Sequence, residues 1–356
     1  MKKLLCLLTI IVILPCFCLK TQAVEEVNEY ISDFEEIVPE GMEDVTDSDA
    51  LIGRLSVEGI LLGIISAIEG EKGRVSEFFL TLLGIIVFSA LGALTPEPLS
   101  EVVLSVIGLV SSATIFKILG DLISELLLSL DKISGFFSLF IPISVGMTAL
   151  GGGESTAILQ GSGMYISLSL LSSLSESVFS SVISLGLAAA LISPLGGRIL
   201  SSLSSGVKAI FTRSLGVFTA IITATFSLQT LVASAADNAA MRAARYMASG
   251  LIPVVGSTVS GAISTLASGM SYAKSVVGGG AVAVIVALAL TPLVAILLYR
   301  LCLSIAIGIS GIACVDSSVF SAYRTALDMA LSLYALSSLI YIFEIIIFIK
   351  SGVTLL

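Results

Sequence analysis

The sequence predicts an all-α fold: a polytopic integral membrane helix bundle with an amphipathic helix before its first membrane span. Hydrophobic residues make up 56% of the 356 residues and charged residues only 12%, about half the charged share of a typical soluble domain. A soluble protein of this length needs more polar surface to cover its core. Long apolar runs also recur along most of the chain. In lipid, only helices and closed β-barrels form all backbone hydrogen bonds internally. The alternation of apolar and polar residues that a barrel needs is absent, so helices are expected.

Residues 1–23 have the layout of a secretory signal peptide. Lys2 and Lys3 form a basic start, an apolar stretch runs from Leu4 to Cys18, and the small residue Ala23 ends the segment. This apolar stretch is short for a membrane span, so we expect cleavage after Ala23. A retained anchor helix is the alternative. Either way, the residues that follow are expected on the extracytoplasmic side.

Residues 24–50 are predicted to form an acidic, disordered extracytoplasmic tail. They carry eleven acidic residues and no basic one, which accounts for the net charge of −9 of the whole chain. Like charge at this density opposes compaction. The simplest interpretation is a solvated spacer, and the alternative is a contact for calcium or a basic partner.

Residues 51–77 are predicted to form the amphipathic helix. Apolar residues recur there at helical spacing, with charged residues on the other positions, so the helix is expected to lie on the membrane or on the bundle. The apolar positions are Leu55, Val57, Ile60, Leu61, Ile64, Ile65 and Ile68.

Residues 78–356 are predicted to be a multi-span membrane domain of seven to nine helices. The runs 102–116 and 250–270 are the weakest spans; the second is rich in Gly and Ser and is an alternative re-entrant hairpin. The amphipathic stretch 117–132 either continues the helix before it out of the membrane or lines a polar interior. The apolar runs are 78–95, 102–116, 134–150, 157–174, 178–194, 215–235, 250–270, 276–298, 301–315 and 330–349.

The orientation of the spans is not fixed by charge. With nine spans starting outside, the inner side holds Arg198, Lys208, Arg213, Arg300 and Lys350, yet nine other basic residues fall outside. This conflicts with the tendency of basic residues to stay inside, so one span is miscounted. Residues 155–206 contain 16 serines, which either line a polar pore or allow tight helix packing, including self-association.

No catalytic, metal-ligating or cofactor-binding residue is predicted, and the chain is not expected to be an enzyme. It has no His, which excludes Ser-His and Cys-His catalysis and the commonest nitrogen ligand of zinc. It has no phosphate-binding loop and no basic patch for nucleic acid. Glu344, inside the run 330–349, is a candidate intramembrane polar residue. The plainer explanation is that it lies near the interface and pairs with a neighbour.

A series of elements after residue 215 resembles one protein family. Gln229 stands in a Ser-x-Gln element, Asp237 follows, and Arg242 and Arg245 lie in an Arg-Ala-Ala-Arg-Tyr element. Residues 250–256 then read Gly-Leu-Ile-Pro-Val-Val-Gly. The order and spacing resemble those of the stage III sporulation protein AE family of endospore-forming bacteria. The family-motif residues are therefore Gln229, Asp237, Arg242, Arg245, Gly250, Pro253 and Gly256.

The residues of the last element have a physical role as well. Pro253 lacks a backbone donor, and Gly250 and Gly256 allow close approach, so this segment can break or turn at membrane depth. Asp237 and Arg245, eight residues apart, are close enough in helical angle to approach each other or a partner chain. Ordinary interface anchoring is the alternative for Arg242 and Arg245.

The resemblance implies a non-enzymatic, multi-pass component of a channel-like or secretion-like complex that links mother cell and forespore after engulfment. It implies a location in the mother-cell membrane around the forespore and, as partners, other membrane and ring-forming proteins of the same complex. A stand-alone secondary transporter or permease of a small solute is the alternative; its two helix interruptions would be 151–154 and 250–256. An intramembrane protease is a weaker alternative, because no pair of Asp residues lies within two apolar runs.

Overall fold

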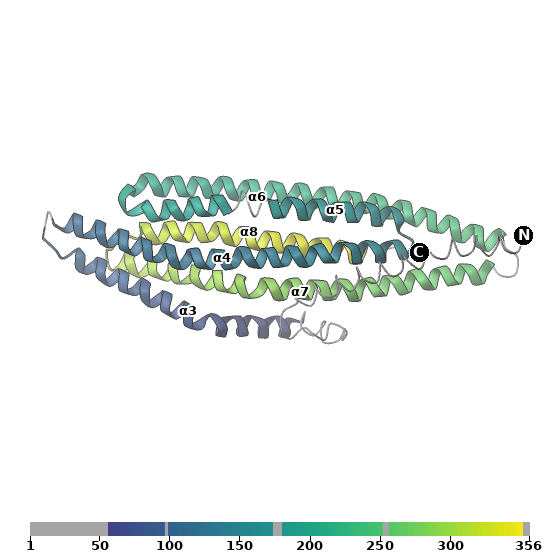
Figure 1. Cartoon of the computed structure of the whole chain (residues 1–356), viewed down its shortest axis with the longest axis horizontal. Coiled ribbons are helices and arrows are strands. Elements are labelled where there is room, and N and C mark those ends of the chain that lie inside the picture. The colour runs from purple at the N-terminus through teal and green to yellow at the C-terminus, as the bar shows by residue number, and fades with distance from the viewer. Residues whose placement is uncertain (1–55, 97–98, 174–179, 252–255, 352–356) are drawn as a thin grey trace, which may run out of the picture. The chain divides into compact units, whose positions relative to one another are not determined.

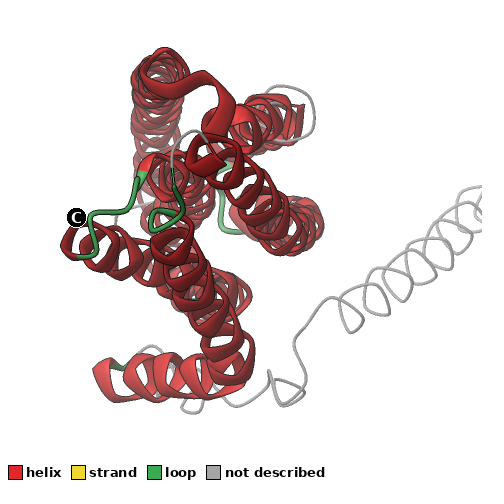
Figure 2. Ribbon diagram, turned by 90° about the vertical axis from the view of Figure 1, so that its left-hand side faces the viewer, coloured by secondary structure: helices red, strands yellow, loops and turns green. Residues whose placement is uncertain are grey.

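Six long α-helices make up almost all of the structure, a computed structural model that describes residues 56–96, 99–173, 180–251 and 256–351. None of these residues lies in a strand. Within the ranges, few side chains between 195 and 205 or between 225 and 267 are described. The predicted signal peptide (1–23) and acidic tail (24–50) fall outside the described residues. Figure 1 shows the helices, and Figure 2, which looks along them, shows how short the described loops are.

The first helix, α3 (Val57–Gly92), joins two segments that the sequence treats separately. The hydroxyl of Ser56 caps it by accepting a hydrogen bond from the backbone N–H of Gly59 at 3.1 Å. The predicted amphipathic helix and the apolar run 78–95 then follow without interruption. Charged residues between 69 and 77 change the polarity of the helix surface, but they do not stop a helix.

The helices α4 (Leu99–Leu150) and α5 (Glu154–Ser173) are separated by a glycine turn. Gly152 adopts a positive φ of 83°, which only glycine adopts freely, so the predicted interruption at residues 151–153 is confirmed. The 52 residues of α4 extend for about 78 Å. This is more than twice the thickness of a membrane's hydrocarbon core.

The longest helical element, α6 (Ser180–Leu251), bends back on itself near its Pro194. The carbonyl of Ala190 accepts a hydrogen bond from Ser112, and the hydroxyls of Ser112 and Tyr323 also meet. Lys208 nevertheless binds Asp328, which is only five residues further along the same partner helix than Tyr323. A straight helix would carry Lys208 about 27 Å beyond Ala190, so the two arms of α6 must lie beside the same part of the bundle.

The last two helices, α7 (Gly256–Ile312) and α8 (Ser318–Lys350), are joined by a short turn. Cys314 has a positive φ of 55° there. A carboxylate oxygen of Asp316 accepts a hydrogen bond from the backbone N–H of Ser318 at 2.9 Å, at the first residue of α8.

Buried tyrosines align α8 with α4. The hydroxyls of Tyr323, Tyr334 and Tyr341 lie 3.1, 2.8 and 3.0 Å from those of Ser112, Ser129 and Ser134, respectively. All three tyrosine side chains are fully buried. Because residue numbers rise together along both helices, α4 and α8 run parallel. These bonds satisfy polar groups that would otherwise be unpaired in an apolar interior.

Within the described residues, five helical segments are long and apolar enough to cross a membrane, and the protein is accordingly an α-helical membrane protein. They are Glu58–Gly92, Leu99–Leu150, Gly206–Ala224, Ser268–Ile312 and Ser318–Lys350. The runs 102–116 and 134–150 both lie on the continuous helix α4, and the run 276–298 and most of the run 301–315 lie on α7. The number of membrane crossings, seven to nine, stays a prediction.

Candidate functional site

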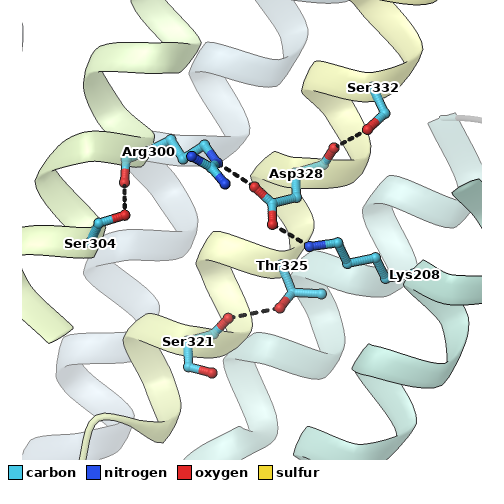
Figure 3. A network of polar contacts seen from close by, with 7 residues as sticks. All are labelled: Lys208, Arg300, Ser304, Ser321, Thr325, Asp328 and Ser332. Atoms are coloured by element: carbon cyan, nitrogen blue, oxygen red, sulfur yellow. Dashed lines mark hydrogen bonds and ion pairs between the residues drawn. The ribbon is translucent and has the colours of Figure 1, made fainter.

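A cluster of charged side chains joins three helices at Asp328. One carboxylate oxygen of Asp328, on α8, accepts a hydrogen bond from the Lys208 ammonium on α6. The other accepts one from Nε of Arg300 on α7. Figure 3 shows the two cations reaching the carboxylate from opposite sides. Only 14% of the Asp328 side chain is exposed, so the paired cations offset most of the cost of placing its charge in the bundle.

The sequence also predicts that Arg324 lies in a polar loop, with Asp316 and Asp328 nearby, and the structure corrects this. Asp316 does lie in the turn before α8, but Arg324 and Asp328 are within the helix. The reason is that a charged residue can lie within a buried helix when a residue of opposite charge pairs with it. The sequence gives no direct sign of that partner, because Lys208 is 120 residues away.

A second polar contact joins α3 to α4. Arg74 donates one hydrogen bond to Glu71, on its own helix, at 2.6 Å and another to Glu125, on α4, at 2.7 Å. Arg74 and Glu125 border a cavity of about 280 Å³ that Glu77, Asp121 and Tyr299 also line. The Arg74 and Glu125 side chains are each more than half exposed, so this pair adds little stability.

An uncharged layer crosses the bundle on one side of the Asp328 cluster. Residues 133–150 of α4, 155–173 of α5, 214–236 of α6 and 275–299 of α7 include no Asp, Glu, Lys or Arg, and residues 329–349 of α8 include only Glu344. The 21 residues of the α8 segment extend for about 32 Å, the thickness of a bilayer's hydrocarbon core.

Lysines mark the other edge of this layer. Nζ of Lys274, on α7, donates a hydrogen bond to the carbonyl of Ser351 at 2.5 Å, and Lys350 is the last residue of α8. With nine spans, Lys350 is expected on the same side as Lys208 and Arg300. Lys208 and Arg300 do both bind Asp328, but Lys350 lies at the opposite edge, because α8 continues without a turn from Asp328 to Lys350.

Glu344 lies inside the layer, and its side chain is buried, with the residue only 1% exposed. Neither of its carboxyl oxygens has a hydrogen-bond partner among the described residues. The hydroxyl of Ser167, on α5, lies beside the carboxyl but outside hydrogen-bonding geometry. The expected explanation, an interfacial Glu paired with a neighbour, is therefore wrong for the residues that the structure describes.

The family-motif residues lie along the last part of α6, in the connection after it and at the start of α7. Gln229, Asp237, Arg242, Arg245 and Gly250 are all in the last part of α6, and Gly256 is the first residue of α7. The side chain of Arg242 is exposed. The side chains of Gln229, Asp237 and Arg245, and all of Pro253, lie outside the described part. The role expected for each stays a prediction.

The family model for stage III sporulation protein AE matches residues 43–354, nearly the whole chain. The chain belongs to this family. Neither the curated proteins nor the solved structures include a significant match. Membership in the stage III sporulation protein AE family gives the chain a role in sporulation, and its apolar helices place that role in a membrane.

The chemistry that this sporulation protein offers is that of charged and hydroxyl groups between helices. Among the described residues, no group of three or more His, Cys, Asp or Glu side chains could hold a metal ion. The Asp328 cluster carries two cations on one carboxylate, which suits it to hold helices together. Glu344 is the one acidic residue in the helix segments that define the uncharged layer.

Proposed function

We propose that the protein is a non-enzymatic, multi-pass component of a channel-like or secretion-like complex that links mother cell and forespore and is needed after engulfment. The observation that carries the proposal is the family match over nearly the whole chain, together with five helices able to cross a membrane. Inter-helix contacts at Asp328, Tyr323, Tyr334 and Tyr341 fit a rigid membrane scaffold for other proteins.

The partners in this proposal are the other membrane proteins and the ring-forming proteins of the same complex. The protein acts in the mother-cell membrane that surrounds the forespore. The stand-alone permease makes a different prediction, because a permease needs no ring-forming partner.

Deleting the gene is expected to stop spore development after engulfment and to leave vegetative growth unchanged. The measurement is the yield of heat-resistant spores, with microscopy to find the stage of arrest. A copy of the wild-type gene at another locus should restore the yield. A normal yield in the deletion strain contradicts the proposed function.

A tagged chain from sporulating cells is expected to purify with ring-forming proteins after mild cross-linking. Vegetative cells that produce the same tagged chain are the control. A chain that is needed for spores but purifies alone would favour the permease over the complex.

The N-terminal tail is proposed to lie outside the mother-cell cytoplasm. The leader is basic and apolar, and the eleven acidic residues after it do not hold a segment in the cytoplasm as Lys and Arg do. Alkaline phosphatase fused after Ala50 should therefore be active, and a fluorescent protein that folds only in the cytoplasm should be dark at the same position. The opposite pair of results would reverse the orientation.

A further inference from the structure

Glu344 is placed where a negative charge is very costly. The neighbouring helices contribute only uncharged residues at this level: 133–150 on α4, 155–173 on α5, 214–236 on α6 and 275–299 on α7. The residue is 1% exposed. An isolated carboxylate in such surroundings is disfavoured so strongly that the group takes up a proton instead.

The nearby cations are engaged elsewhere. Nζ of Lys274 donates to the carbonyl of Ser351 and lies 5.3 Å from the centre of the Phe348 ring, at the end of α8. Lys350 is exposed and six residues from Glu344, on a different side of the helix. Among the described residues, each ion pair involves Arg74, Lys208 or Arg300, and none includes Glu344.

Polar side chains form an interface between α5 and α8 around this carboxyl. Ser167 lies beside Glu344, and Oε1 of Gln160 accepts a hydrogen bond from the Ser351 hydroxyl at 3.0 Å. The two contacts are seven residues apart on each helix, so α5 and α8 run antiparallel here. One turn before Glu344, the hydroxyl of Tyr341 meets that of Ser134 on α4 at 3.0 Å. One hydroxyl, that of Ser167, therefore lies beside the carboxyl, and two more meet each other one helical turn away.

We propose that Glu344, with Ser167 beside it, is a proton-binding site inside the membrane layer of the bundle. The carboxyl holds one exchangeable proton, and the Ser167 hydroxyl beside it is a group that accepts hydrogen bonds as readily as it donates them. A metal ion would require several oxygen ligands, and the described residues bring a single hydroxyl beside the carboxyl. The site goes beyond the proposed function and does not depend on it.

The proposal predicts a distinctive reactivity with carbodiimides, which require a protonated carboxyl. The full-length protein in detergent micelles is treated with apolar dicyclohexylcarbodiimide, and modified peptides are identified by mass spectrometry. Glu344 is expected to react. Its labelling rate should fall by up to about tenfold per pH unit once the proton dissociates. Glu344→Gln should remove that modified peptide and leave the others unchanged.

Glu154 provides the matched control, because it is exposed at the first turn of α5. A water-soluble carbodiimide with an added amine should modify Glu154 and spare Glu344. Labelling of Glu344 that does not depend on pH, or that favours the water-soluble reagent, overturns the proposal. So does failure of Glu344 to react with either reagent, since an exchangeable site must be reachable. If sodium at constant ionic strength protects Glu344 from labelling, the site binds sodium rather than a proton, and the proposal is overturned.

Discussion

Gly278→Ala is expected to destabilise the bundle, whereas the same substitution at the next residue, Gly279, is expected to be neutral or stabilising. Gly278 of α7 is buried against the end of α8. A Cβ atom there would overlap the Ile349 side chain and would reach within 3.4 Å of Cδ1 of Phe348. A Cβ atom at Gly279 meets nothing within 4 Å.

The overlap at Gly278 is hard to relieve. Ile349 is branched at Cβ, which restricts its side-chain rotation. Phe348 is fully buried, and its ring packs edge-on against Phe140 at 5.3 Å between centroids. Added volume in such packing costs about 1–3 kcal/mol, whereas Gly→Ala in an open helical position gains up to about 1 kcal/mol.

The measurement is the thermal unfolding midpoint of each variant in the same detergent. The midpoint should fall for Gly278→Ala and stay level or rise for Gly279→Ala. Equal midpoints for the two variants would show that α7 and α8 do not approach each other as closely as the structure has them.

Local sequence features predicted the helical class and the position of one turn. The glycines at 151–153 permit the positive φ that ends α4, and Gly152 adopts it. The low charge indicated a membrane protein, in which the backbone must form all its hydrogen bonds internally. Because barrel-type alternation is absent, only helices remained.

Helix continuity was harder to predict, because hydropathy and helix formation are different properties. Residues 117–132 and Arg300 interrupt apolar runs, yet they contain no proline and do not stop α4 or α7. Pro194 shows the opposite case: it falls inside one helical element, and the chain reverses nearby. Residues 117–132 continue the helix before them, and the choice between leaving the membrane and lining a polar interior stays a prediction.

The candidate sites were predicted in part. Glu344 stands out in the sequence as the only charged residue of an apolar run, but whether it has a partner depends on α5 and α7, which lie elsewhere in the chain. Nothing in the sequence indicated that Asp328 pairs with Lys208 and Arg300, because these partners lie 120 and 28 residues away. Only packing brings such residues together.

Asp328→Asn is expected to weaken the bundle at the edge of the uncharged layer. Asparagine keeps the shape of the side chain but leaves Lys208 and Arg300 with no negative partner in the cluster. Losing one partner of a fully buried pair costs about 3–5 kcal/mol, and an exposed pair contributes about 0–1 kcal/mol. Because the two cations are each about one-third exposed, we expect a loss of about 2 kcal/mol.

Asp131→Asn on α4 is the matched control, since Asp131 is exposed and forms no ion pair among the described residues. It should leave the thermal midpoint unchanged.

Exchanging all three groups in Lys208→Met, Arg300→Met and Asp328→Leu should recover part of the loss caused by Asp328→Asn, because no charge is then left unpaired. A triple variant that is much less stable than Asp328→Asn would contradict this explanation. It would show that the attraction between the three charges itself stabilises the bundle. Equal midpoints for Asp328→Asn and Asp131→Asn would show that α6, α7 and α8 are held together without the cluster.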